Sequence, residues 1–134
     1  MNRKCARENA FLLLFEAVCK SDETAEEIFE KAVSVRELEY DAYVKSVFFG
    51  VKENSRVIEE CIEKSLVGWK SDRVSIASMA ILRLSTYELM FMNDIPTKVS
   101  INEAVELSKK YDADKAYAFV NGVLNAVAKE ARGQ

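Results

Sequence analysis

The sequence has 134 residues, a length typical of one domain that buries about two-thirds of its unfolded surface. With one proline, four glycines and abundant alanine, leucine, glutamate and lysine, it favours an all-α fold with a single domain over residues 1–134. A net charge of −3 and a pI near 5.2 argue against a surface built wholly for nucleic acid, so any RNA site must be a local basic patch.

Residues with the chemistry of catalysis or metal binding are scarce. The chain has no histidine, and its three cysteines lie far apart without any CxxC pair: Cys5, Cys19 and Cys61. The chain therefore lacks the residues for a Ser-His or Cys-His nucleophile pair and for a zinc site. It also has no glycine-rich loop of the kind that binds phosphate. We accordingly expect no enzyme, no metal and no cofactor, with free thiols as in a reducing cytoplasm.

The predicted first helix covers residues 3–20 and carries a broad apolar face. One stripe recurs at helical spacing: Ala6, Ala10, Leu13, Leu14 and Ala17. A second line runs beside it and continues backward in steps of four to two arginines: Val18, Phe15, Phe11, Arg7 and Arg3. The early apolar run at 10–15 is too short for a signal sequence or a membrane span, so no membrane association is expected.

The basic start of this helix has two interpretations. In the functional one, Arg3, Lys4 and Arg7 neutralise RNA phosphates. Phe11 or Phe15 then faces a partner. In the structural one, the helix start is solvated and both phenylalanines lie in the core. Basic charge at a helix N-terminus opposes the helix dipole, which favours the functional interpretation.

Two helical regions follow. Residues 21–35 are predicted to form a short acidic helix that begins with a capping box of Thr24 and Glu27 and serves structure alone. A longer region covers residues 36–66 at near-helical spacing. We expect a kink or a break in it at Asn54.

Residues 68–72 are predicted to form a turn, in which Ser71 or Asp72 caps the next helix. That helix, over residues 76–91, is apolar on almost every side. A helix of this kind is central, so we expect the others to pack against it. It ends before Pro96, because proline lacks a backbone N–H and restricts the residue before it.

Two charged residues, Arg83 and Glu88, stand in this nearly all-apolar helix. An unpaired buried charge is costly, so each needs a partner or a place at the surface. We favour a structural ion pair over direct contact with a ligand.

The last two helices carry their own start signals. Ser100 stands where an N-cap is expected, and Glu103 completes a capping box. The final helix is predicted to begin at Asp112 or Asp114. Gly122 in its middle costs about 1 kcal/mol relative to alanine, which indicates close packing of a neighbouring helix.

Phe119 lies at the edge of the apolar stripe of the final helix, with Lys115 one turn earlier. An aromatic ring at the border of core and solvent can stack on an RNA base. Alternatively, Phe119 closes the core, and the pattern alone favours this interpretation.

Three segments in this half resemble one known family in their order and spacing: ILRL with TYEL, DIPTKVSINEAVEL and FVNGVLN. They are similar to the C-terminal half of the NusB family of transcription antitermination factors. The start, RKCARENAFLLLF, more weakly resembles the basic opening helix of that family. The resemblance implies a NusB-like bundle of about six to seven helices. It also implies a cytoplasmic protein that binds the boxA RNA of ribosomal RNA transcripts together with the ribosomal protein NusE, within the RNA polymerase antitermination complex.

The resemblance assigns an RNA-binding role to matching residues. Arg3, Lys4 and Arg7 match the arginine-rich start of the family and would contact RNA phosphates. Phe119 matches the aromatic residue that contacts RNA, and we add Lys115 beside it.

The protein partner NusE is assigned to other side chains. Phe15 stands where the family often has an aromatic residue on the side that faces NusE, and Phe11 lies on the same line. Ser78 and Met79 occupy a place where many relatives have an acidic residue followed by a basic one. Cys5 also departs from the family, because it interrupts the basic run.

Two other functions are alternatives. The chain could be a helical homodimer or scaffold without significant RNA affinity, with the broad apolar face of the first helix as its dimer surface. It could also be the RNA-binding part of a ribosomal RNA methyltransferase, whose helical domain resembles NusB. The chain ends at Gln134 without a cofactor-binding domain, which argues against the methyltransferase.

Overall fold

The computed structural model describes residues 1–69 and 74–133, and over these residues it is helical without any strand. Seven helices follow in chain order: α1 (Arg3–Cys19), α2 (Ala25–Ser34), α3 (Ala42–Glu53), α4 (Ser55–Ser65), α5 (Ile76–Phe91), α6 (Thr97–Tyr111) and α7 (Ala116–Arg132). The predicted all-α bundle is confirmed. No described helix is both long and apolar enough to cross a membrane.

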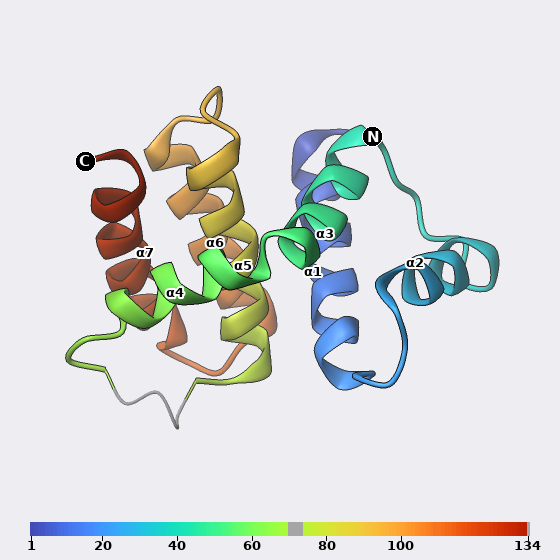
Figure 1. Ribbon diagram of the computed structural model, residues 1–134, viewed down its shortest axis with the longest axis horizontal. Coiled ribbons are helices and arrows are strands. Elements are labelled where there is room, and N and C mark those ends of the chain that lie inside the picture. Colours follow the sequence, from blue (N-terminus) through green and yellow to red (C-terminus); the bar gives the residue numbers. More distant parts are fainter. Residues whose placement is uncertain (70–73, 134) are drawn as a thin grey trace.

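The helices form two groups, with α1 to α3 on one side and α4 to α7 on the other (Figure 1). α5 joins them, because it packs against α1 and α3 of the first group and against α4, α6 and α7 of the second. Its buried residues point to nearly every side, as expected of a helix that is apolar all round. The predicted central position of this helix is confirmed.

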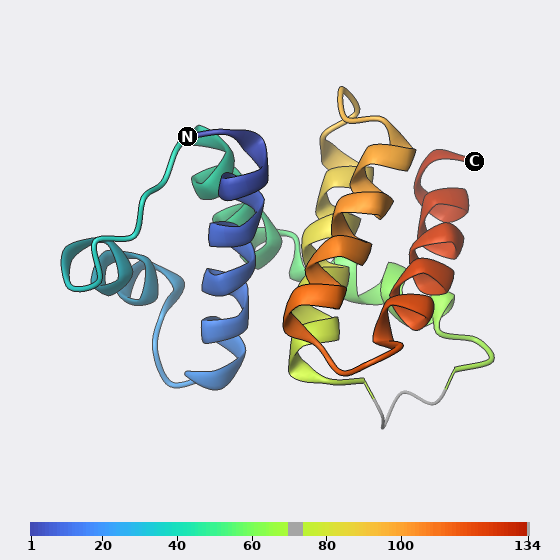
Figure 2. The same ribbon diagram turned by 180° about the vertical axis from the view of Figure 1, so that it is seen from behind.

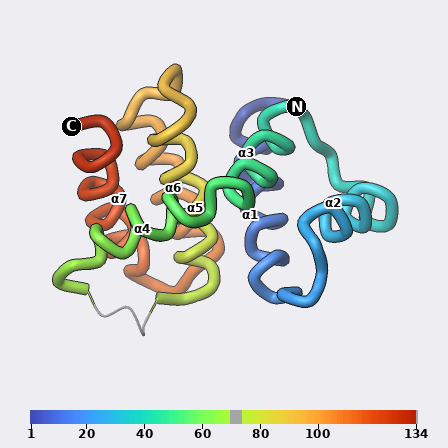
Figure 3. Tube along the Cα trace, in the orientation of Figure 1, coloured from blue at the N-terminus to red at the C-terminus, as the bar shows by residue number. Residues whose placement is uncertain are grey.

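The chain crosses from one group to the other where α3 ends and α4 begins (Figure 3). Asn54 interrupts the helix there, and its side-chain amide donates to the carbonyl of Gly50 at 2.8 Å. The predicted break is therefore confirmed. The predicted start of this region near residue 36 is wrong, because α3 begins only after Asp41, which accepts the backbone N–H of Val44 at 3.0 Å.

Side-chain caps define the starts of several helices. The predicted capping box of α2 is confirmed: the Thr24 hydroxyl accepts the N–H of Glu27, and the Glu27 carboxylate accepts the N–H of Thr24. At α5 the N-cap is Ser75, whose hydroxyl accepts a backbone N–H of the first turn at 2.9 Å. Ser71 and Asp72, the caps expected there, lie outside the described residues.

The capping box expected at Ser100 is wrong. α6 begins at Thr97, directly after Pro96 and three residues before Ser100. Proline at a helix start already has the φ angle that the helix needs, and here φ is −61°. Ser100 is instead buried inside the helix, where its hydroxyl lies 2.8 Å from that of Ser85 in α5. Glu103 does not cap the helix and instead forms an ion pair with Arg7 of α1.

Candidate nucleic-acid interface

The start of α1 presents two exposed cations. Asn2 caps the helix, accepting the backbone N–H of Cys5 at 2.8 Å. Arg3 and Lys4 follow in the first turn, without an acidic residue beside them. The guanidinium carbon of Arg3 lies 4.4 Å from the ring centroid of Tyr43, a cation–π contact that anchors it over α3. Neither cation has an ion-pair partner among the described residues, so both charges are open to a phosphate.

Arg7 points into the molecule instead. Its Nε donates to Oε2 of Glu88 at 2.8 Å, and its Nη1 lies 3.8 Å from Oε1 of Glu103. The side chains of Arg7 and Glu88 are only 6% and 0% exposed. The Tyr43 hydroxyl donates to the same oxygen of Glu88. The phosphate contact expected of Arg7 is therefore replaced in this structure by a buried ion pair.

This environment shifts the pKa of both Arg7 and Tyr43. Burial works to lower the pKa of Arg7, but the charge of Glu88 and its hydrogen bond outweigh burial and raise it. Burial raises the pKa of Tyr43, and Glu88 raises it further, so the phenol keeps the proton that it donates. The pairing expected of both core charges is confirmed, since Nε of Arg83 also lies 2.6 Å from Oε1 of Glu59.

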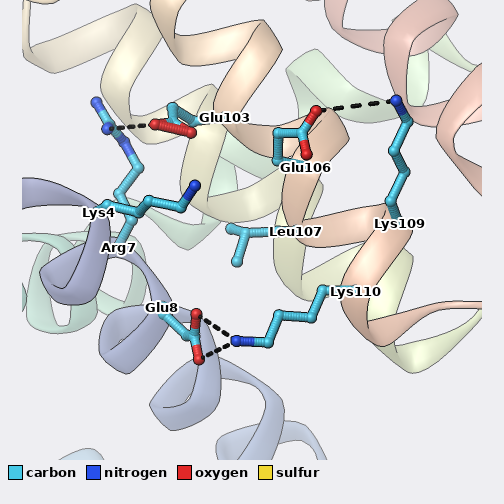
Figure 4. A pocket seen from close by; sticks show the side chains of 8 residues that line it. All are labelled: Lys4, Arg7, Glu8, Glu103, Glu106, Leu107, Lys109 and Lys110. Carbon is cyan, nitrogen blue, oxygen red and sulfur yellow. Dashed lines mark hydrogen bonds and ion pairs between the residues drawn. The ribbon is translucent and has the colours of Figure 1, made fainter.

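A crevice of about 270 Å³ lies between α1 and α6 (Figure 4). Four cations and three carboxylates line it together with one leucine: Lys4, Arg7, Lys109, Lys110, Glu8, Glu103, Glu106 and Leu107. Glu8 ties the two helices together, because Nζ of Lys110 lies 2.9 and 3.0 Å from its two oxygens. The Tyr111 hydroxyl donates to it as well, at 2.5 Å, and these hydrogen bonds lower the pKa of Glu8.

Lys109 lies between this crevice and α7 and places a positive charge there. Its Nζ lies 3.8 Å from Oε1 of Glu106 and 5.2 Å from the ring centroid of Tyr117, at the start of α7. The sequence reasoning missed Lys109, Lys110 and Tyr117. Two lysines at a helix C-terminus interact favourably with the helix dipole. In the sequence alone their position therefore has a structural explanation and does not indicate an RNA contact.

The start of α7 carries the second predicted group. The helix begins at Ala116, and not at Asp112 or Asp114 as predicted, because Lys115 adopts a left-handed conformation with φ of 70°. Lys115 is exposed at this corner. Phe119, one turn into the helix, is half-buried and packs against the core.

Trp69 is the neighbour of Phe119 that the sequence reasoning missed. The two ring centroids are 5.1 Å apart, and the ring planes meet at 79°. Phe119 therefore packs against the core, as one of the two alternatives expected, and it also lines a pocket beside Trp69. Its stacking on an RNA base stays a prediction.

The structure does not bring the two predicted RNA-binding groups into one patch. α1 begins at the upper end of the molecule in Figure 2, whereas α7 begins at the lower end. Lys109 and Lys110 connect them, since both share the crevice with Lys4 and Lys109 also reaches the ring of Tyr117. We call this surface the basic path; it runs over α1, α6 and α7 and comprises Arg3, Lys4, Lys109, Lys110, Lys115, Tyr117 and Phe119.

The residues expected to face a protein partner have different environments. Phe11 is 1% exposed and packs against Tyr111, with ring centroids 4.8 Å apart, so its expected partner contact is wrong. Ser78 is 2% exposed and donates to Asp112, so it too has no surface for a direct contact. Phe15 is half-buried and keeps part of its ring accessible. Most of the rest of the broad apolar face of α1 is buried against α2, α3 and α5, which leaves little of the dimer surface that the scaffold alternative requires.

Within the described ranges, no group of three or more histidine, cysteine, aspartate or glutamate residues is placed to hold a metal ion. The cysteines are free: Cys5 and Cys19 are exposed, and Cys61 is buried. Burial raises the pKa of the Cys61 thiol, which keeps it protonated.

Comparison with known proteins gives one consistent result. A sequence model of the NusB family matches residues 4–129. The transcription antitermination protein NusB of Clostridium novyi is 44% identical over 132 residues, covering 96% of this chain and 99% of the relative. The NusB protein of Bacillus licheniformis is 43% identical over 130 residues, covering 97% and 98%.

Solved structures agree with the sequence relatives. NusB of T. maritima superposes with a TM-score of 0.85 at 36% identity, covering 99% of this chain and 95% of the other. The NusB chain in a crystal structure of the antitermination factors NusB and NusE with dsRNA gives a TM-score of 0.83 at 32% identity, covering 96% of both chains.

Proposed function

This chain belongs to the NusB family of transcription antitermination proteins, and on that premise we propose that it binds boxA RNA of ribosomal transcripts together with NusE. Its likeness to a NusB that was crystallised with NusE and double-stranded RNA supports both partners. We further propose that it works in the cytoplasm as part of the RNA polymerase antitermination complex.

One observation carries the RNA role: the two cations in the first turn of α1 are exposed and unpaired within the described residues. Cations at a helix N-terminus oppose the helix dipole, so their position is explained better by a phosphate ligand than by helix stability. In our proposal Arg3 and Lys4 bind phosphates at one end of the basic path. Lys115 and Phe119 bind a phosphate and a base at the other end.

Arg7 has a different part in this proposal. Its guanidinium is occupied by Glu88 in the interior, one turn below Arg3 and Lys4. We assign it to holding the first turn of α1 in place against α5. The two exposed cations then meet the RNA at a fixed position.

We place NusE on the side of α1 that carries Phe15, the predicted partner residue that keeps accessible ring surface. Phe11 supports that ring from below, with the two centroids 6.0 Å apart. Ser78 acts indirectly in this proposal, by fixing Asp112 and with it the loop between α6 and α7.

The test is fluorescence anisotropy of a labelled boxA-type RNA and a scrambled RNA, each titrated with and without NusE. Wild type is expected to prefer boxA and to gain affinity with NusE. Arg3→Ala/Lys4→Ala removes two phosphate contacts, so its log–log salt dependence should be less steep by about 1.4, at about 0.7 per contact on a single strand.

The matched control is Lys52→Ala/Lys129→Ala, which removes the same charge from exposed positions on α3 and α7 outside the basic path. It should keep the wild-type salt dependence. The proposal fails if wild type shows no preference for boxA with NusE present, or if both double variants lose affinity equally.

A further inference from the structure

We propose that Tyr43 is a positioning residue for RNA binding: its ring, fixed from the interior by Glu88, holds the guanidinium of Arg3 where a phosphate is to be bound. The inference rests on the proposed RNA-binding function and adds to it a residue that acts through Arg3 without contacting RNA itself. Tyr43 lies in the first turn of α3, a helix that has no other part in the proposed RNA site.

Tyr43 is held in place before any ligand arrives. Its side chain belongs to the core, and the residue is only 4% exposed. Its hydroxyl points into the molecule and donates a hydrogen bond to Oε2 of Glu88 on α5. Burial raises the pKa of Tyr43, and the charge of Glu88 raises it further, so the phenol stays protonated and the hydrogen bond persists. A ring fixed both at its backbone and at its hydroxyl can turn little.

Arg3 lies over this ring at the surface. Its guanidinium carbon is 4.4 Å from the ring centroid, within the range of a cation–π contact. The guanidinium carbon of Arg7 lies 5.9 Å from the same centroid, but that side chain is buried and paired with Glu88. The two arginines of the first two turns therefore have different partners: Arg7 has the interior carboxylate, and Arg3 has the ring.

An aromatic ring is a suitable partner for a cation that must also bind a phosphate. A carboxylate beside Arg3 would occupy its N–H groups and balance its charge, so that a phosphate would have to displace it. A ring attracts the cation through its π electrons and requires no N–H group. No described residue accepts a hydrogen bond from the Arg3 side chain, so its five N–H groups remain for phosphate oxygens.

The position of Arg3 matters because a free arginine side chain has many rotamers. A side chain that is already held loses less conformational entropy when it binds, and for one long side chain the gain is about three- to tenfold in affinity. Lys4, the next residue, instead lines the crevice between α1 and α6. It is a cation of the same turn outside the contact with Tyr43, and it therefore serves as a comparison.

The experiment is a double-mutant cycle in RNA affinity, measured by fluorescence anisotropy of a labelled boxA-type RNA with NusE present. Tyr43→Leu removes the ring, and we expect it to lose about three- to tenfold in affinity. In an Arg3→Ala background the same change should cost nothing further, because the ring acts through that cation. Lys4→Ala should have the same effect with and without the ring. If Tyr43 only maintained the fold of α1, both cations would lose their contribution together.

The salt dependence separates position from charge. Tyr43→Leu keeps the charge of Arg3, so the slope of its log–log salt dependence should match that of wild type. Arg3→Ala removes a phosphate contact, and its slope should be less steep by about 0.7 on a single strand.

Two further variants separate the ring from the hydroxyl and from tyrosines in general. Tyr43→Phe keeps the ring and loses only the hydrogen bond to Glu88. It should be less stable than wild type but retain most of the RNA affinity. Tyr40→Leu is the matched control: it removes a ring that contacts Phe29 instead, at 5.0 Å between centroids, and should bind RNA as wild type does.

A measurement on wild type alone decides the matter if Tyr43→Leu does not fold. In nuclear magnetic resonance spectra without RNA, the ring should shift the side-chain protons of Arg3 upfield, and the Nε–H group of Arg3 should be about as ordered as the backbone. Random-coil shifts together with a disordered Nε–H group would show that the ring does not hold the side chain.

The inference is overturned if Arg3→Ala costs the same in wild type and in folded Tyr43→Leu, or if Lys4→Ala depends on the ring as strongly as Arg3→Ala does. In both cases the proposed function stands as long as Arg3→Ala/Lys4→Ala weakens RNA binding. If wild type shows no preference for boxA RNA with NusE present, both fall.

Discussion

Arg7, Tyr43 and Glu88 come from three different helices and meet at one buried carboxylate oxygen. Each supplies what the others need: the guanidinium balances the charge, and the phenol contributes a second hydrogen bond. The remaining oxygen of Glu88 has no hydrogen-bond partner among the described residues. A carboxylate in this state depends on Arg7, because an uncompensated buried charge is strongly unfavourable.

Replacing Arg7 by alanine should therefore destabilise the protein severely. We expect the free energy of unfolding to fall by about 3–5 kcal/mol, because removing one partner of a buried ion pair leaves the other without compensation. Urea denaturation followed by circular dichroism measures this. Arg83→Ala is the matched control: its pair with Glu59 is 28% and 36% exposed, and loss of a solvated pair costs about 0–1 kcal/mol. Equal losses in the two variants would contradict the assignment.

The sequence predicted that Glu88 needs a partner but not which one. Arg7 continued a line of phenylalanines in steps of four, which placed it correctly beside Phe11 on the helix. The direction of its side chain depends on Glu88, 81 residues later, and a contact of this range leaves no mark in local spacing. Trp69 was missed for a similar reason, because its partner ring comes from α7.

Among the elements, α1 and α6 are joined by Glu8, and this link should depend on pH. The hydrogen bond from Tyr111, followed by that from Lys110, lowers the pKa of Glu8 in the folded state. A carboxylate with a lowered pKa stabilises the fold above its unfolded pKa, about 4.3, and loses this effect as the pH falls through the folded value.

We therefore expect Glu8→Gln to be less stable than wild type at pH 7, and the difference to shrink as the pH falls below about 4. Urea midpoints measured between pH 7 and pH 3 test this. Glu60→Gln is the control, since the one ion pair of Glu60 within the described residues is an exposed pair with Arg56 at 3.4 Å. A difference between Glu8→Gln and wild type that stays constant with pH would refute the role of the carboxylate.

α3 and α5 approach closely at a glycine. A β-carbon at Gly50 would lie 2.3 Å from Cε1 of Tyr87, a distance that requires the ring to move. We expect Gly50→Ala to destabilise by about 1–3 kcal/mol through overpacking, although alanine favours a helix over glycine by about 1 kcal/mol.

A double-mutant cycle in urea with Tyr87→Leu tests the cause of that loss. Because leucine lacks the outer ring atoms, adding Tyr87→Leu should cancel most of the cost of Gly50→Ala. The two effects would simply add if the glycine were needed for its backbone alone.

Most elements could be predicted, because their signals are local. Each signal lies in a short stretch of neighbouring residues: the apolar residues on every side of α5, the capping box of α2 and the break at Asn54. The prediction at Ser100 was wrong because a serine three residues before a glutamate occurs both in a capping box and in a helix interior. Here α6 begins directly after Pro96, so Ser100 lies inside the helix and contacts Ser85.

At the scale of the whole molecule, the basic path depends on how the two groups of helices meet. One end lies on α1 and the rest on α6 and α7, which belong to the other group (Figure 2). The family resemblance predicted both ends, and the sequence gives no sign of the crevice that links them. Side-chain links from Glu8 to Lys110 and Tyr111 join α1 to α6. In our proposal they help to set the separation of the two ends that a single-stranded RNA must reach.

The separation of Arg7 and Glu88 by 81 positions in the sequence also bears on how the protein is made. Translation is vectorial, so α1 leaves the ribosome long before α5 exists, and domains complete their folding only when all parts are available. Until then Arg7 lacks Glu88, and the apolar face of α1 lacks the part of its cover that α5 supplies. The helix that carries the proposed phosphate contacts is thus the first to be synthesised, and its packing is complete only once α5 has been made.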